Sequence, residues 1–193
     1  MVSLSGFVSL SFLAPPIYTK WVIHKSSSLE VQGSTNVNTF SCVIPNYSSP
    51  DTLIIYNTKN NAGAIPLSGE ITLSTKSFDC HNPMMTAELR KILKGDQYPK
   101  FHIRFISLNK LPALFSEKET INGWVEIELA NVTKRMEIDY QFSKDAQKNI
   151  HLTGNRVVNF TDFNIIPPRK LGGMIKTNNK LNIEFHLQLK TIN

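Results

Sequence analysis

Five histidines and two cysteines are the residues of this chain best suited to bind a metal ion or to act as nucleophiles. Cys80 and His81 are adjacent, but a Cys/His nucleophile pair needs a third group that orients the base. No HExxH motif or other paired-ligand spacing joins the histidines, which are His24, His81, His102, His151 and His186. We therefore expect neither a metal site nor catalysis at these positions.

The short motifs of common enzyme classes are also missing from the sequence. It contains no GxSxG elbow, no GxGxxG loop and no phosphate-binding P-loop. Asp162 lies between two aromatic residues in the segment FTDF, shortly before a Pro-Pro pair. We interpret Asp162 as an acceptor for backbone groups in a turn, with a polar anchor near a barrel opening as the alternative. The sequence thus favours a protein that is not an enzyme and needs no cofactor.

The two cysteines, Cys42 and Cys80, each follow a strand-like segment and lie outside any CxxC or Cys/His metal spacing. In an exported chain such a pair usually forms a disulfide. Closing a loop of this length would stabilise the fold by about 4 kcal/mol, because it restricts the unfolded chain. The alternative is a pair of buried free thiols in a cytosolic protein.

The first residues have the texture of an export signal. Residues 2–14 read VSLSGFVSLSFLA, with no charge before Lys20, as in the apolar region of a signal peptide. No Lys or Arg precedes this stretch, and Pro15 would obstruct cleavage after Ala14. We interpret residues 1–16 as a truncated signal peptide, with an edge strand as the alternative, and 17–193 as one domain. The protein is then periplasmic or secreted.

The chain of 193 residues is basic, with a formal net charge of +6. Such a balance can indicate a nucleic-acid or anionic-membrane partner. The cations, however, form no tight run typical of a nucleic-acid arm; the densest spots are Arg90, Lys91 and Lys94, then Lys134 and Arg135, then Arg169 and Lys170. We predict a solvated basic surface and no nucleic-acid partner. Peripheral membrane contact and a homodimer both stay open.

Alternation of apolar and polar residues dominates the sequence, most clearly in 67–73, 101–105, 125–129, 136–142 and 181–189. A period of two indicates strands with one apolar and one wet face. The apolar faces pack inward, and as a set they would line whatever lumen exists. The candidate ligand-lining residues are Phe101, Ile103, Phe105, Val125, Ile127, Leu129, Ile138, Tyr140, Phe142, Ile183, Phe185 and Leu187.

One amphipathic helix is expected over about residues 83–94. Asn82 can cap it, Pro83 suits the first helical position, and Gly95 can end it. Its lid-forming residues would be Met84, Met85 and Leu89, since thioethers are soft contacts for a flexible tail. Many strands with a single helix predict an all-β fold, either a sandwich or a closed barrel, and we favour the barrel with the helix capping it.

Four stretches in order give this chain a resemblance to a known family: 26–42 (SSSLEVQGSTNVNTFSC), 77–105 (SFDCHNPMMTAELRKILKGDQYPKFHIRF), 124–136 and 152–168 (LTGNRVVNFTDFNIIPP). From about Trp21 to the C-terminus the chain resembles the YceI-like family of lipocalin-like, lipid-binding barrels. It departs from the commoner members at the helix start, where Asn82-Pro83-Met84-Met85 stands in place of Arg-Asp-His-Leu. The resemblance is therefore to a divergent branch.

This resemblance implies an eight-stranded antiparallel barrel with a helix near its mouth. It also implies a lumen that holds a long isoprenoid or another amphiphilic lipid, in the bacterial cell envelope. A barrel of about eight strands can hold one ligand or be filled by its own side chains. The competing hypothesis is thus a filled-barrel envelope protein that acts through a protein partner or in a stress response, without lipid.

Overall fold

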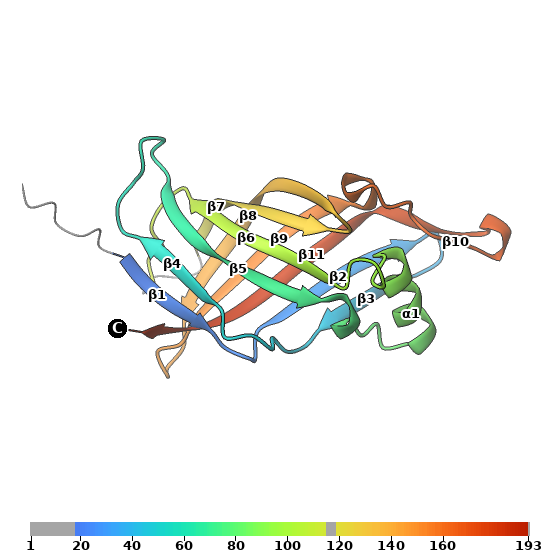
Figure 1. The fold of residues 1–193 in the computed structure, drawn as a ribbon, viewed down its shortest axis with the longest axis horizontal. Helices are drawn as coiled ribbons and strands as arrows, with labels where there is room; N and C mark the ends of the chain where they lie inside the picture. The colour runs from blue at the N-terminus through green and yellow to red at the C-terminus, as the bar shows by residue number, and fades with distance from the viewer. Residues whose placement is uncertain (1–17, 115–118, 193) are drawn as a thin grey trace, which may run out of the picture.

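Antiparallel strands make up most of the computed structural model, which describes residues 18–114 and 119–192 (Figure 1). The expected leader, 1–16, lies outside the described residues. The strands are β1 (Tyr18–Ile23), β2 (Ser28–Thr35), β3 (Thr39–Ile44), β4 (Thr52–Tyr56), β5 (Ile65–Ser74), β6 (Lys100–Leu108), β7 (Glu119–Leu129), β8 (Val132–Lys144), β9 (Ile150–Asn159), β10 (Arg169–Lys170) and β11 (Ile175–Ile192). The helical elements are α1 (Pro83–Ile92) and the 3-10 turns η1 (Thr75–Ser77), η2 (Phe160–Phe163) and η3 (Leu171–Gly173).

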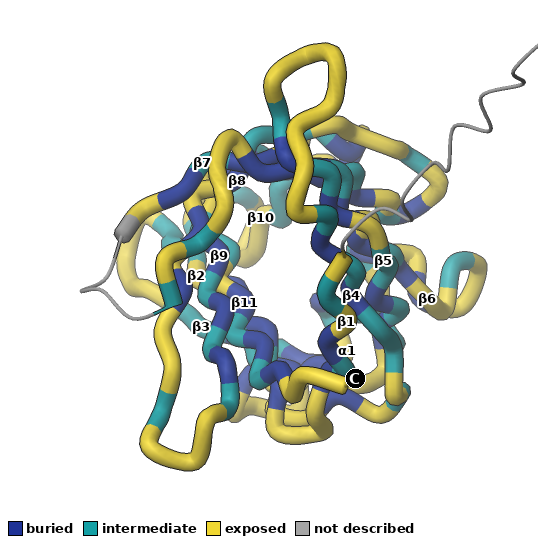
Figure 2. The backbone as a smooth tube through the Cα atoms, turned by 90° about the vertical axis from the view of Figure 1, so that its left-hand side faces the viewer, coloured by how far each residue is buried: buried dark blue, intermediate teal, exposed yellow. Residues whose placement is uncertain are grey.

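The strands close into a ring in the order β1-β4-β5-β6-β7-β8-β9-β11, and β11 pairs back onto β1. Figure 2 shows the ring in a view roughly down the barrel axis. Every pairing in it is antiparallel. The predicted eight-stranded antiparallel barrel with one α-helix is therefore confirmed.

The long strand β11 sets the shape of the barrel. One of its edges pairs with β9, while the other pairs with β2 over Thr177–His186 and with β1 over Leu189–Ile192. Consequently β1 and β2 pair one after the other along the same edge of β11. The β2–β3 hairpin lies at the end of the barrel where α1 also lies (Figure 1). We call this the helix end.

A covalent bond crosses the wall at the helix end. In the part of the chain that the structure describes, β3 has no ladder with β5; instead Val43 and Asp79 exchange two backbone hydrogen bonds of 2.8 Å. The neighbouring pair, Cys42 and Cys80, lies directly opposite and forms a disulfide, as the sequence predicted. Both cysteines are buried, so the bond joins β3 to the segment that leads into α1.

Helix α1 begins where the sequence predicts and ends two residues earlier than expected. The Asn82 side chain accepts a hydrogen bond from the Met85 amide at 3.0 Å, and Pro83 holds the first helical position. At the other end Lys94, and not Gly95, adopts the left-handed conformation, with φ of 52°. Gly95 is nevertheless needed there, because a Cβ atom would lie 2.9 Å from the Thr75 hydroxyl and 3.0 Å from the Arg90 carbonyl oxygen.

The disulfide should supply a large share of the stability of the helix end. The Cys42→Ser/Cys80→Ser variant is expected to lose about 4 kcal/mol of unfolding free energy, because the loop that the bond closes becomes free in the unfolded chain. Urea unfolding with and without a thiol reductant measures this difference. The reductant should destabilise the native protein and leave the variant unchanged, and an equal effect on both would contradict the assignment.

Candidate ligand-binding site

An apolar cavity of about 60 Å³ lies inside the barrel at the helix end. All but one of its lining residues are hydrophobic, and the exception, Asn159, is engaged with the Asp162 carboxylate through its backbone amide at 2.8 Å. The lining residues are Leu29, Val31, Phe78, Leu89, Leu93, Phe101, Ile103, Ile127, Leu129, Val158, Asn159, Phe160, Phe163, Ile165, Leu181 and Ile183. A space of this kind has no attraction for polar solutes and favours apolar ones.

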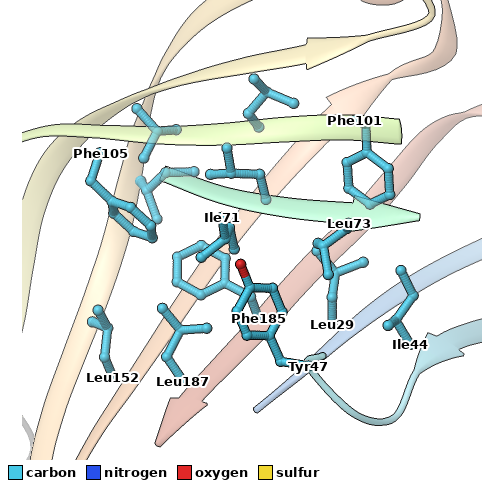
Figure 3. Close-up of a cluster of buried hydrophobic side chains, with 14 of the residues drawn as sticks. Leu29, Ile44, Tyr47, Ile71, Leu73, Phe101, Phe105, Leu152, Phe185 and Leu187 are labelled. Atoms are coloured by element: carbon cyan, nitrogen blue, oxygen red, sulfur yellow. The ribbon is translucent and has the colours of Figure 1, made fainter. Parts of the chain in front are cut away.

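Aromatic side chains close the floor of this cavity. Phe105, Tyr140 and Phe185 pack against one another with ring centroids 5.9–6.4 Å apart. Phe105 and Phe185 each follow a cavity-lining residue by two positions, so they lie one step deeper in the barrel. Figure 3 shows both rings turned into the interior among aliphatic side chains. The middle of the barrel is therefore filled by its own side chains.

A glycine on β9 makes this aromatic packing feasible. A Cβ atom at Gly154 would lie 2.2 Å from the Phe185 ring, which is far inside the contact distance of two carbon atoms. The residue has no positive φ, so it is the close approach, and not backbone conformation, that requires glycine here. Gly154 therefore lets the Phe185 ring pack directly against the backbone of β9.

Among the residues that the structure describes, two polar atoms of the barrel interior lack a hydrogen-bond partner. They are the Tyr140 hydroxyl and the Trp21 indole nitrogen, both almost completely buried. Burial raises the pKa of Tyr140 above its usual value, because the phenolate would be desolvated. Tyr140 is therefore a neutral donor at physiological pH. An unpaired buried donor costs roughly 1–3 kcal/mol of stability. A hydrogen bond from either atom to an acceptor would therefore be more favourable than the same hydrogen bond in water.

An outer groove of about 200 Å³ adjoins the cavity between α1, the β2–β3 hairpin and the β10–β11 hairpin. Its apolar wall includes Val37, Phe40, Met85, Ile92, Pro168 and Ile175. Leu89 and Phe160 line both spaces, so these two side chains form the partition between them. Across the groove Lys170 of β10 forms an ion pair with Glu88 of α1.

The structure divides the residues predicted to line a ligand into two groups. Those that line the cavity are Phe101, Ile103, Ile127, Leu129 and Ile183. Those that lie in the packed interior beyond its lining are Phe105, Val125, Ile138, Tyr140, Phe142, Phe185 and Leu187. Among the predicted lid residues, Leu89 lines cavity and groove, Met85 lines the groove, and Met84 is 75% exposed and lines neither.

Sequence reasoning missed the part of the lining that comes from the turn η2 and the segment around it. Phe160, Phe163 and Ile165 all face the cavity. The signal was the pair of aromatics around Asp162, which is hard to interpret without the turn geometry. Asp162 accepts a hydrogen bond from the Asn159 amide, as expected for a turn residue, and this bond fixes the 3-10 turn that directs both phenylalanines inward.

The polar clusters lie on the outer wall of the barrel, away from the cavity. Glu70 pairs with Arg104 and His102 at 3.0 Å. On the strands β9 and β11, His151 bonds His186 at 2.9 Å, and burial lowers the pKa of His186. Within residues 18–114 and 119–192, no group of three or more His, Cys, Asp or Glu side chains is arranged to hold a metal ion. Among the same residues, no helix is long and apolar enough to cross a membrane.

Comparisons with known proteins give this chain relatives. A family model described as the YceI-like domain matches residues 22–189. A polyisoprenoid binding domain from Saccharophagus degradans, implicated in plant cell wall breakdown, matches with a TM-score of 0.64 and 11% identity, over 92% of this chain and 100% of that chain. BcnA from Burkholderia cenocepacia matches with a TM-score of 0.62 and 14% identity, over 84% of this chain and 95% of that chain. A YceI protein from Campylobacter jejuni matches with a TM-score of 0.53 and 12% identity, over 100% of this chain and 94% of that chain. No curated protein matches the sequence.

Removing the partition should join cavity and groove. Leu89→Ala is expected to lower the unfolding free energy by about 2–5 kcal/mol and to speed the uptake of a fluorescent fatty acid in stopped-flow mixing. Leu152→Ala is the matched control, because Leu152 is fully buried and lines neither space. It should cost comparable stability without faster uptake, and the same acceleration in both variants would refute the role of Leu89.

Proposed function

This chain belongs to the YceI-like domain family, and from that premise we propose that it binds the apolar tail of a lipid, either an isoprenoid or a fatty-acid-like molecule. The observation that carries the proposal is the cavity at the helix end, whose lining is hydrophobic apart from Asn159. A neighbour of the same fold described as a polyisoprenoid binding domain supports the ligand class.

The driving force would be desolvation of the tail. Each methylene moved from water into an apolar site contributes about 0.8 kcal/mol. Within the described part of the chain no charged side chain lines the cavity, so these residues would not hold a polar headgroup by charge. The tail would enter first, and the headgroup would stay in the groove beside Lys170 and Glu88.

The path of entry follows from the partition. The cavity of about 60 Å³ is smaller than the roughly 150 Å³ that accommodates benzene in an engineered core. A long tail therefore needs more room than the closed structure offers. The groove supplies it once Leu89 and Phe160 turn aside, and the flexible Met85 side chain lines the route. The helix α1 would act as a partial lid.

We further propose that the protein works in the bacterial cell envelope, as a periplasmic or secreted carrier and not as an enzyme. The Cys42–Cys80 disulfide supports an oxidising compartment. The expected leader over residues 1–16 would direct export. The ligand-lining role falls on the cavity residues of β6, β7 and β11, and the lid role on Met85 and Leu89.

The filled-barrel hypothesis keeps one specific observation in its favour. The aromatic floor of Phe105, Tyr140 and Phe185 occupies the middle of the barrel. Native mass spectrometry of the gently purified protein, followed by organic extraction, separates the two hypotheses. A stoichiometric apolar molecule supports the carrier. An apo mass that persists after incubation with isoprenoids and fatty acids supports a barrel that acts through a protein partner.

Filling the cavity should block binding. Val158 lines the cavity, whereas Val157, one residue earlier on the same strand, points outward and is 56% exposed. Val158→Phe is expected to weaken binding of a fluorescent fatty acid about tenfold or more, and Val157→Phe to leave it unchanged. Urea unfolding verifies that both variants fold. Equal binding by the two variants would place the ligand elsewhere.

Affinity should also rise with tail length. In a series of straight-chain alcohols, each added methylene is expected to tighten binding roughly fourfold, until the tail is longer than the site. Isothermal titration at one temperature measures the slope and the length at which it ends. An affinity that does not depend on chain length would contradict binding by desolvation.

A further inference from the structure

The β10–β11 hairpin carries large apolar side chains at its tip, where they contact water. Leu171 is 70% exposed and Met174 is 75% exposed, on either side of Gly172 and Gly173. Figure 1 shows this hairpin projecting beyond the barrel at the helix end. Solvent-exposed leucine and methionine at the tip of a projecting ribbon are typical of surfaces that meet an apolar partner.

The hairpin tip is held in place by the rest of the protein. The Asn36 side chain, from the turn between β2 and β3, donates to the Met174 carbonyl oxygen at 2.9 Å and accepts from the Lys176 amide at 2.8 Å. The Asn36 amide in turn donates to the Lys176 carbonyl oxygen at 3.0 Å. These hydrogen bonds hold the backbone around Leu171 and Met174 in one conformation in the free protein.

The charges of the hairpin are all positive. Residues 165–180 contain Arg169, Lys170, Lys176 and Lys180 and no acidic residue. Arg169 and Lys176 are direct partners across the two strands, so their side chains share one face. Like charges placed opposite each other repel, and an anion between them removes that repulsion. On the other face Lys170 is paired with Glu88 at the groove.

Further exposed apolar residues lie at the same end of the barrel. Val37, at the tip of the β2–β3 hairpin, is 65% exposed and lines the groove. Ile166 is 85% exposed and lies between Ile165 of the cavity and Pro168 of the groove. The apolar tip and the entrance to the groove therefore lie at the same end of the barrel, and Arg169 and Lys176 lie there on the face of the hairpin that points away from the groove.

We propose that this end of the barrel docks on an anionic lipid bilayer, with Leu171 and Met174 inserted between the headgroups and with Arg169 and Lys176 bound to lipid phosphates. Apolar side chains at an interface and cations near anionic lipids contribute additively to such binding. Insertion of the tip brings the groove, which lies on the other face of the hairpin from Arg169 and Lys176, close to the headgroups, so that a tail has a short path between bilayer and cavity. This use of the barrel end rests on the proposed function, whereas docking itself can be measured without it.

The test is sedimentation of the purified protein with vesicles of phosphatidylcholine alone, or of equal parts of phosphatidylcholine and phosphatidylglycerol. The protein should sediment with the anionic vesicles only. Both Arg169→Gln/Lys176→Gln and Leu171→Ser/Met174→Ser should weaken partitioning about tenfold or more. Lys59→Gln/Lys190→Gln, which removes two exposed cations from the opposite end, and Val157→Ser, which removes an exposed valine from the wall, are the matched controls and should partition as the native protein does.

Salt gives an independent readout, because the Debye length falls from about 10 Å at 0.1 M to about 3 Å at 1 M. The partitioning that depends on Arg169 and Lys176 should be lost at the higher concentration. Partitioning that is equal in hairpin and control variants would overturn the proposal. So would self-association of the native protein that Leu171→Ser/Met174→Ser abolishes, since the tip would then bind a second copy of this chain.

A vesicle-free titration with a fluorescent fatty acid separates docking from ligand binding. The hairpin variants should bind the fatty acid as tightly as the native protein. Binding of fatty acid without any sedimentation with anionic vesicles would reject docking and leave the carrier function standing. Sedimentation without binding of fatty acid or isoprenoid would reject the carrier function and leave docking standing.

Discussion

The backbone pairing of β11 is the constraint on which the rest of this structure depends. An eighteen-residue strand offers more hydrogen-bonding edge than any single neighbour fills, and here β1 and β2 divide one of its edges between them. Buried backbone groups need partners, so the division is forced once β11 runs the length of the barrel. As a result β4 pairs only with Leu67 and Ser68 of β5, and β3 forms no ladder with the rest of that strand within the described residues. The segment that bears Cys80, together with α1, covers the barrel at this point. The cavity lies beneath this cover.

The packing of side chains in the barrel interior thus differs between its two ends. Towards the end formed by β1 and β4, buried aromatic and aliphatic side chains, among them Trp21 and Phe142, occupy the lumen. Towards the helix end, the cover packs on the strands less completely and a space remains. An unfilled apolar space of about 60 Å³ costs about 1.4 kcal/mol at the usual cost per unit of cavity volume. The hydrophobic lining of this space is compatible with an apolar molecule, which is the ligand class of the proposed function.

Much of this architecture could be predicted from residue patterns. Alternation identified the long strands and which face of each is buried, and the caps at Asn82 and Pro83 located the start of the helix. Alternation does not encode depth along the barrel, because Ile103 and Phe105 share a face while one lines the cavity and the other closes its floor. Depth is set by the register between strands, which depends on contacts far apart in sequence. A different reason hid the contribution of Phe160 and Phe163, whose direction depends on the geometry of a 3-10 turn that Asp162 fixes through a local hydrogen bond.

The disulfide has a mechanical consequence for the cover of the cavity. Thr86 and Arg90 bond α1 to the segment 76–80, so helix and segment form one rigid flap, and Cys42–Cys80 fastens that flap to β3 by a bond that thermal motion does not break. Its far side is fastened to β10 by the ion pair of Glu88 and Lys170, both partly exposed, and such pairs are worth about 1 kcal/mol or less. The flap is therefore tied covalently to β3 on one side and by a weak ion pair to β10 on the other. Releasing the flap would expose Phe78, Leu89 and Leu93, which are buried, so apolar burial and not the ion pair sets the cost of opening.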